Sequence, residues 1–229
     1  MDYEEFRARA DAVVARIRLA CAAAGRDAAG VELLAVTKSH PPEAVELAAR
    51  YGLRSVGENR VQEGADKRAR TAAAVKWELI GHLQSNKARL AVQNFDRIQS
   101  VDSARLAGIL DRIAGELGRT LPVLLQVNAG LDPAKSGAEP EAAPALLEAA
   151  LGCANLRVEG LMTIAPLSDD PGVARRAFSN LREIRDRLSS AAGAALGVLS
   201  MGMSGDIEAA VAEGSTLVRV GSALFGPRA

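Results

Sequence analysis

The chain has 229 residues, a length that suits one large domain or two small ones. Its 28 basic and 28 acidic residues give a formal net charge of zero, so bulk electrostatics favour neither a nucleic-acid nor a membrane partner. Hydrophobic residues make up 48%, enough for a sizeable core, and no stretch reaches the roughly 18 apolar residues of a membrane-spanning helix.

The N-terminal segment and the two cysteines indicate a cytoplasmic protein. The N-terminal segment is charged and lacks the apolar centre of a secretory signal. The two cysteines, Cys21 and Cys153, lie far apart in the sequence and match no metal-binding or redox spacing. This usage is typical of a reducing compartment, and we predict no metal site.

Helical and extended patterns alternate along the whole chain. Helical periodicity predicts helices over 2–24, 42–51, 60–73, 84–91, 103–117, 140–151, 172–190 and 204–213, with a polar loop over 129–138. Short apolar runs between them predict strands over 31–36, 55–57, 76–80, 97–101, 121–127, 156–161, 196–199 and 217–220.

Eight strands separated by helix-length segments favour an α/β fold with parallel strands and right-handed crossovers. We therefore predict a single domain over 1–229, a closed (β/α)₈ barrel of the TIM type. The extra N-terminal helix would cover the gap left by the absence of a helix after strand eight. An open doubly wound sheet is the alternative, and it is disfavoured because no G-x-G-x-x-G follows the first strand.

A lysine, Lys38, lies where the first strand runs out. The apolar run 31–36 changes abruptly into polar residues 37–40, and two prolines follow. A lysine at the carboxyl end of a buried strand has rigid backbone and apolar neighbours, which favour the free amine over the ammonium. The free amine is the nucleophile of Schiff-base chemistry, whereas the alternative is an ordinary surface lysine.

Each of the eight predicted strands runs into a polar or small residue. These residues are Lys38, Asn59, His82, Asp102, Asn128, Thr163, Ser200 and Arg219. In a barrel the carboxyl ends of all the strands meet at one face, which carries the catalytic and binding sites. Loops are polar in general, and that alone accounts for part of the pattern.

Two segments after strands seven and eight combine glycines with hydroxyl groups. Residues 200–205 open the helix predicted over 204–213, and residues 219–222 lie at the end of the last strand. In barrels these two loops often bind phosphate, helped by a helix N-terminus. With a strand-one lysine they predict a phosphate-bearing ligand that forms a Schiff base, either pyridoxal 5′-phosphate (PLP) or the sugar phosphate of an aldolase.

Seven short segments, in order, resemble the YggS/PROSC family of PLP-binding proteins, also called PLP homeostasis proteins. The segments are 35–38, 57–59 with 61–63, 80–87, 100–103, 160–163, 200–204 and 218–222, and the resemblance extends over 34–228. The chain departs from the family's usual pattern at Val56 and Arg60, where aromatic residues are common, and at Glu78, where histidine is common. We expect these departures to change the rim of the pocket.

The resemblance implies a barrel similar to the N-terminal domain of alanine racemase, with PLP held as a covalent aldimine on Lys38. It implies phosphate contacts from Ser204, Gly221 and Ser222. It also places Arg219 beside the cofactor, against either its pyridine nitrogen or its phosphate. The remaining predicted pocket residues are Asn59, His82, Met162, Ser200 and Met203.

The resemblance implies a PLP carrier in PLP and amino-acid homeostasis, with amino acids or PLP-dependent apoenzymes as further partners, and we expect a monomer. The alternatives are a PLP-dependent amino-acid racemase and a Schiff-base lyase acting on a sugar phosphate. Racemisation needs a base on each face of the adduct. In alanine racemases the second base is a tyrosine from another domain of a neighbouring subunit. The tyrosines here are Tyr3 and Tyr51, in predicted helices away from the site, so we predict no substantial catalytic turnover.

Overall fold

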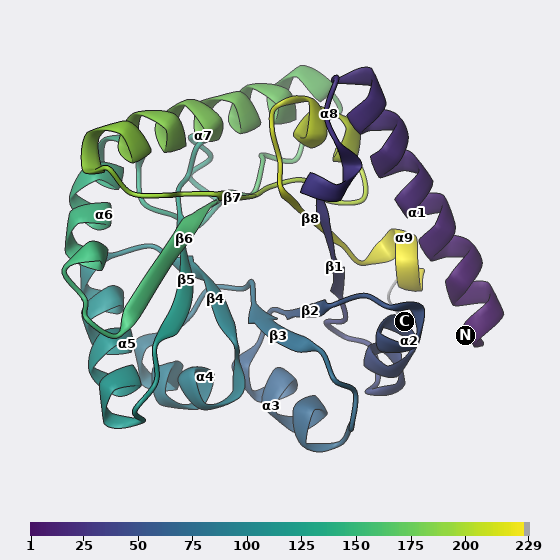
Figure 1. Ribbon diagram of the computed structural model, residues 1–229, viewed down its shortest axis with the longest axis horizontal. Coiled ribbons are helices and arrows are strands. Elements are labelled where there is room, and N and C mark those ends of the chain that lie inside the picture. The colour runs from purple at the N-terminus through teal and green to yellow at the C-terminus, as the bar shows by residue number, and fades with distance from the viewer. Residues whose placement is uncertain (227–229) are drawn as a thin grey trace.

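The computed structural model describes residues 1–226, which form a closed barrel of eight parallel strands in the order β1 to β8 (Figure 1). The strands are β1 (Glu32–Val36), β2 (Ser55–Glu58), β3 (Lys76–Leu79), β4 (Arg97–Val101), β5 (Leu121–Gln126), β6 (Leu156–Met162), β7 (Val198–Ser200) and β8 (Leu217–Val220).

Helices surround this barrel. They are α1 (Tyr3–Ala23), α2 (Glu43–Tyr51), α3 (Val61–Ala69), α4 (Ala88–Asn94), α5 (Ala104–Glu116), α6 (Ala143–Leu151), α7 (Pro171–Ala192), α8 (Ile207–Ala212) and α9 (Ser222–Phe225). Three 3₁₀ turns cover Ala28–Gly30, Ser85–Lys87 and Pro140–Ala142. Within residues 1–226 no helix is both long and apolar enough to cross a membrane.

The predicted barrel is confirmed, one predicted helix begins later than expected, and one helix is additional. The helix expected to begin at residue 204 begins at Ile207, because the Asp206 carboxylate accepts a hydrogen bond from the Met203 amide and holds 203–206 as a turn. The short helix α9 was not predicted, because four residues are too few to show helical periodicity.

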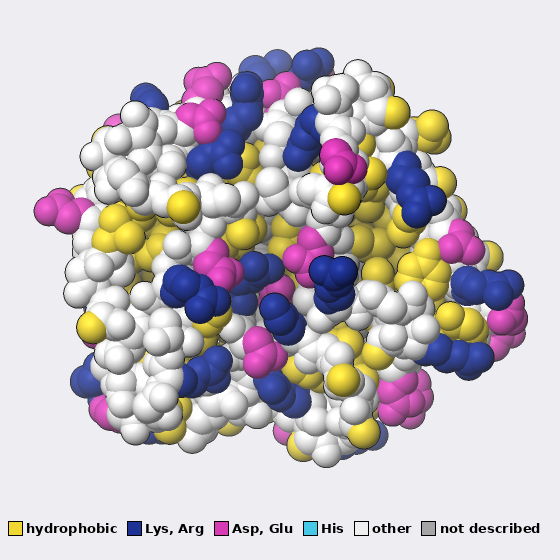
Figure 2. All heavy atoms as spheres, in the orientation of Figure 1, with side chains coloured by type: hydrophobic (Ala, Val, Ile, Leu, Met, Phe, Trp, Pro, Cys, Tyr) yellow, Lys and Arg dark blue, Asp and Glu magenta, His cyan; other side chains and the backbone are white. Residues whose placement is uncertain are grey.

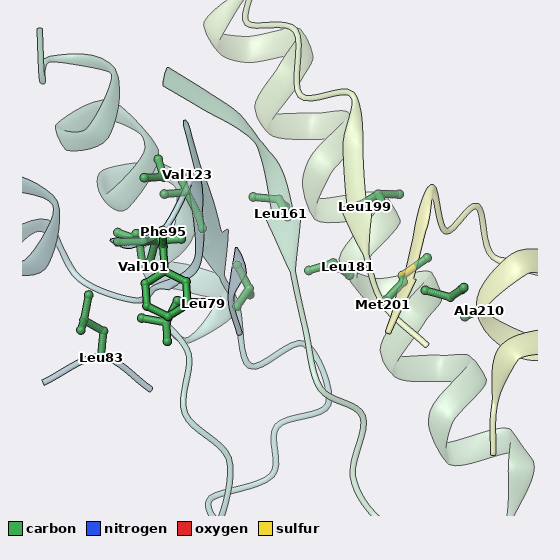
Figure 3. Packing of buried hydrophobic residues seen from close by; sticks show 14 of the residues in the cluster. Leu79, Leu83, Phe95, Val101, Val123, Leu161, Leu181, Leu199, Met201 and Ala210 are labelled. Atoms are coloured by element: carbon green, nitrogen blue, oxygen red, sulfur yellow. The ribbon is translucent and has the colours of Figure 1, made fainter. Parts of the chain in front are cut away.

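The main core lies between the strands and the helices that cover them. Figure 3 shows Phe95 beside Leu79, Leu83 and Val101 in one part of this layer. Phe95 is fully buried, and its ring fills the space beside Gly64 of α3, where a Cβ would lie 2.4 Å from the ring. The aromatic side chain therefore fixes how closely α3 approaches the barrel.

The interior of the barrel holds a second, smaller cluster of apolar side chains: Leu34, Val36, Ile80 and Leu217. Along β1 these inward residues alternate with the outward-packed Leu33 and Ala35, as the two-residue period of a strand requires. Val198 packs against this cluster, and buried polar side chains such as Gln99 and Arg219 share the interior with it.

The first helix covers the gap beside β8, as predicted. It packs against α8 and α9, with Phe6 stacked on Phe225 at 5.3 Å between ring centroids. Asp2 caps α1 by accepting a hydrogen bond from the Glu5 amide at 2.8 Å. The N-terminal helix therefore closes the outer layer next to the last strand.

We predict that Gly160→Ala destabilises the barrel. A Cβ at Gly160 of β6 would lie 1.9 Å from the Val198 carbonyl oxygen on the paired strand β7, so backbone has to move. We expect a loss of about 1–3 kcal/mol in the free energy of unfolding, measured by urea denaturation. The matched control is Gly108→Ala in the exposed middle of α5, where nothing lies within 4 Å. This control should gain about 0.5–1 kcal/mol, and equal behaviour of the two variants would contradict the steric argument.

Candidate functional site

A cavity of about 430 Å³ opens at the carboxyl ends of the strands, within the range of about 300–1,000 Å³ typical of small-ligand sites. Eight of the ten predicted pocket residues line it: Lys38, Asn59, His82, Met203, Ser204, Arg219, Gly221 and Ser222. Residues separated by more than 180 positions in the sequence are thus brought around one space.

Lys38 and the loop after β8 lie next to each other at the carboxyl ends of two neighbouring strands. Strand β1 pairs with β8 in the register Ala35 with Val220, so the two carboxyl ends lie side by side. A Cβ on Gly221 would lie only 3.2 Å from the Val36 carbonyl oxygen, and glycine permits this close approach. The lysine is half-buried at this junction.

The two predicted anion-binding loops meet directly. The Ser222 hydroxyl donates a hydrogen bond to the Ser204 hydroxyl at 3.1 Å, and the Ala223 amide donates to the same oxygen at 3.4 Å. Arg16 of α1 supports the loop from behind by donating to the Ser204 carbonyl oxygen at 3.0 Å. Hydroxyl and backbone groups therefore form this wall, whereas the predicted helix N-terminus at Ser204 does not.

Arg219 lies at the bottom of the cavity and is 4% exposed. Its guanidinium donates to the Ser200 hydroxyl at 2.7 Å and to the Thr163 carbonyl oxygen at 2.8 Å. Burial lowers the pKa of Arg219 to about 10, against the opposing effect of the Asp206 and Glu78 carboxylates. The side chain therefore brings a fixed positive charge to the cavity at neutral pH.

The expectation that Met162 and Ser200 line the cavity is wrong. Both are fully buried, and neither reaches its surface. Ser200 instead holds Arg219 and donates its own hydroxyl proton to Gln99 Oε1 at 2.6 Å. It is the last residue of β7.

A chain of hydrogen bonds continues from Ser200 through the inside of the barrel. Gln99 donates to Glu78 Oε2 at 2.5 Å, and Glu78 forms a 2.7 Å ion pair with Arg97, which also contacts Glu159 at 3.0 Å. Charged side chains of both signs gather over the strands at the centre of the face in Figure 2. Glu78 does not line the cavity, so its departure from the family pattern does not change the rim.

Several lining residues were not predicted. Gln126 ends β5 and donates to the Ser136 carbonyl oxygen at 2.6 Å, which brings residues 134–136 over the cavity. His40 lies at the rim, with its ring 5.0 Å from that of Phe225. Inward placement of the last residue of β5 could have identified Gln126, but the folding back of the polar loop has no local sequence signal.

His82 occupies the rim beside a carboxylate. Its Nδ1 lies 3.4 Å from Asp102 Oδ2, and its side chain is 55% exposed. The rim residues His40, Asn59 and His82 also border an adjoining open groove, which Arg60, Arg70 and Lys87 line. Of the three departures noted in the sequence, Arg60 is the one near the rim, since Val56 is fully buried.

Polar groups outside the barrel wall hold the backbone on both sides of Lys38. The buried Lys67 ammonium donates to the Thr37 carbonyl oxygen at 2.7 Å and to Glu58 Oε1 at 2.7 Å. The Thr37 hydroxyl donates to the same Glu58 oxygen at 2.6 Å. Glu63 accepts from Lys67 at 2.8 Å and from the Ser39 amide at 2.5 Å.

The pKa values of the two carboxyl groups in this network are shifted in opposite directions. Burial raises the pKa of Glu58, although hydrogen bonds from Lys67 and Thr37 oppose the rise, and Glu58 Oε2 has no hydrogen-bond partner among the described residues. Burial also acts to raise the pKa of Glu63, but hydrogen bonds from Lys67 and Ser39 outweigh it and lower that pKa. Lys67 is thus the cation on which the buried Glu58 carboxylate depends.

The comparisons with known proteins agree with this architecture. Residues 9–229 match the family model described as alanine racemase, N-terminal domain. Over 220 residues the chain is 45% identical to the pyridoxal phosphate homeostasis protein of Pseudomonas aeruginosa, covering 94% of this chain and 93% of that protein. The chain belongs to the pyridoxal phosphate homeostasis protein family.

Solved structures add two further likenesses. PipY of Synechococcus elongatus, solved with PLP bound, is 46% identical, has a TM-score of 0.81 and covers 86% of this chain and 93% of its own. An alanine racemase of Clostridium difficile shares 18% identity at a TM-score of 0.77, covering 86% of this chain and 53% of its own. This second likeness shows the fold alone, and it confirms the predicted similarity to the N-terminal domain of alanine racemase.

We predict that Lys67→Met destabilises this family member by about 3–5 kcal/mol at neutral pH, because Glu58 is left buried without its cation. The pKa of Glu58 would then lie further above its value in the unfolded chain. The loss in free energy of unfolding relative to wild type is therefore complete above the pKa of Glu58 in the folded variant, and it shrinks as the pH falls through that pKa.

Chemical denaturation at a series of pH values measures this deficit. The control is the double variant Glu58→Leu/Lys67→Met, which removes both charges and should regain most of the lost stability at neutral pH. A deficit in Lys67→Met that does not change with pH would contradict the assignment to Glu58.

Proposed function

We propose that this protein binds PLP covalently through the Lys38 amine and takes part in intracellular PLP and amino-acid homeostasis. The observation that carries the proposal is the shared cavity, in which Lys38 lies beside the joined Ser204 and Ser222 loops and above Arg219. The names of the relatives and the PLP-bound structure of PipY support the choice of ligand.

The lining residues fit such a ligand chemically. An aldehyde needs an amine, which Lys38 offers, and a phosphate needs donors, which the serine hydroxyls and the backbone at Gly221 offer. Arg219 presents a positive charge whose direction is set by Ser200 and Thr163. PLP, when bound, supplies an electron sink, whereas the protein supplies orientation and charge.

We further propose that the protein acts as a carrier in the cytoplasm without substantial turnover. The tyrosines lie away from the cavity: the Tyr51 hydroxyl donates to Asp11 at 2.6 Å, and that of Tyr3 to the Arg50 carbonyl oxygen at 3.5 Å. Burial and the bond to Asp11 raise the pKa of Tyr51 to about 12. Neither tyrosine is therefore placed as the second base that racemisation needs.

We predict that borohydride treatment of the PLP-loaded protein fixes the cofactor on Lys38, located by peptide mass spectrometry. Lys38→Ala should lose the fixed cofactor and the yellow colour of the linkage, while retaining part of the affinity through the phosphate contacts. The matched control is Lys135→Ala, which removes another lysine that lines the same cavity and should keep the linkage. Fixation mainly on Lys135 or Lys87 would overturn the assignment.

We predict no efficient conversion of amino acids. Single L-amino acids incubated with the loaded protein in deuterium oxide should show slow α-proton exchange at most, with no accumulation of the D-isomer, by NMR and chiral chromatography. The rim carries two imidazole groups, His40 and His82, that could act as acid–base groups. Repeated turnover that disappears in Lys38→Ala would identify an enzyme and contradict the carrier proposal.

A further inference from the structure

The backbone around Lys38 has an unusual conformation that its own sequence does not favour. Ser39 has a φ of 62°, in the left-handed region that residues other than glycine rarely adopt. Such a conformation persists when surrounding contacts impose it. Two contacts hold it here: the His40 amide donates to the Thr37 carbonyl oxygen at 3.1 Å and closes a turn, and the Ser39 amide donates to Glu63 Oε1 at 2.5 Å.

On the other side of Lys38, Thr37 is held at every polar group. Its amide donates to the Gly57 carbonyl oxygen at 3.1 Å, its hydroxyl donates to Glu58, and its carbonyl oxygen accepts from Lys67. Both neighbours of the lysine are therefore tied to one set of three charged side chains, Glu58, Glu63 and Lys67. These belong to β2 and α3, on the outer side of the barrel wall, and none of the three lines the cavity.

The stability of the fold does not by itself explain this set. A buried ion pair is weak evidence for stability, because apolar residues of similar volume often serve equally well. Here Lys67 and Glu58 have side chains that are 7% and 0% exposed, and one Glu58 oxygen has no hydrogen-bond partner among the described residues. What the charges achieve beyond packing is a set of directed hydrogen bonds that end on Thr37 and Ser39.

We propose that Glu58, Glu63 and Lys67 form a positioning unit that sets the direction in which Lys38 projects into the cavity. None of the three is a catalytic residue, since they act through the backbone on either side of the lysine. This inference rests on the proposed function insofar as the positioned amine is the one that PLP uses. Covalent attachment depends steeply on the placement of the reacting atoms, and misplacement by about 1 Å costs on the order of 100-fold in rate.

The test compares two backgrounds, with and without Lys38. Glu63→Ala removes the acceptor for the Ser39 amide, and its 25% exposed side chain makes it the variant best tolerated by the fold. It should slow PLP attachment by about tenfold or more in stopped-flow absorbance. In the Lys38→Ala background the same change should leave noncovalent PLP affinity, measured by fluorescence, within about twofold.

The matched control is Glu116→Ala. Its side chain is 39% exposed and bonded to Arg89 and Arg112, at the end of α5 and outside the lining of the cavity. This control should change neither measurement. The double variant Glu58→Leu/Lys67→Met removes the rest of the unit without leaving a buried charge, and it should slow attachment as Glu63→Ala does.

A second measurement needs no PLP. In the ligand-free protein, the rate of reductive methylation of Lys38 by formaldehyde and borohydride, followed by peptide mass spectrometry, should change about threefold or more in Glu63→Ala. The rate at Lys135, which lines the same cavity, serves as the internal reference and should stay constant.

The outcomes separate this inference from the proposed function. Equal losses of PLP binding with and without Lys38 would mean that the three residues support the whole cavity, and would overturn the positioning role. An unchanged methylation rate at Lys38 would overturn it as well. A wild-type protein that attaches no PLP to Lys38 would refute the proposed function, while the methylation rates would still decide whether the unit directs the lysine.

Discussion

The pairing of β1 with β8 is the constraint on which the rest of the molecule depends. Four residue pairs, from Glu32 with Leu217 to Ala35 with Val220, join the first strand to the last and close the sheet. This closure puts the lysine-bearing end of β1 beside the glycine-containing end of β8. The site is thus a direct result of a long-range backbone contact, and neither half of the chain contains it alone.

Two polar systems support Arg219 and Lys38 from behind. One runs inside the barrel, where Ser200 and Gln99 link Arg219 to Glu78. The other lies outside the wall, where Glu58 and Lys67 hold the backbone beside Lys38. Because burying each charged group costs free energy, each is compensated by at least one charge-assisted contact. The cavity therefore has a preorganised positive character that belongs to the fold itself.

Much of this arrangement could be predicted from sequence, because the barrel depends on repeated local signals. Alternating apolar runs and helical periods identified all eight strands, and the lysine and the Ser204 and Ser222 loops were found as polar interruptions at strand ends. Ser200 and Met162 were misplaced because polarity at a strand end does not say how deep a residue lies in the barrel. Depth follows from strand register, which is set by pairing with neighbours far away in sequence.

The supporting residues were missed for a related reason. Glu58 and Glu63 lie in the segments 57–59 and 61–63 that carry the family resemblance, and Lys67 has the pattern of a surface helix, but none of these patterns indicates a role in supporting Lys38. What distinguishes them is their contact with a loop 21 to 30 residues upstream, and periodicity carries no information about such contacts.

Closure of the sheet limits the ways in which another macromolecule can bind this protein. In a ring of eight paired strands, the described residues present no free sheet edge with a row of unpaired amide and carbonyl groups. Another polypeptide therefore has no strand to extend, and backbone-to-backbone augmentation is closed to it. Recognition has to proceed through side chains on the helices and on the loops around the cavity. Those loops are the part of the barrel in which sequence can vary without disturbing the ring.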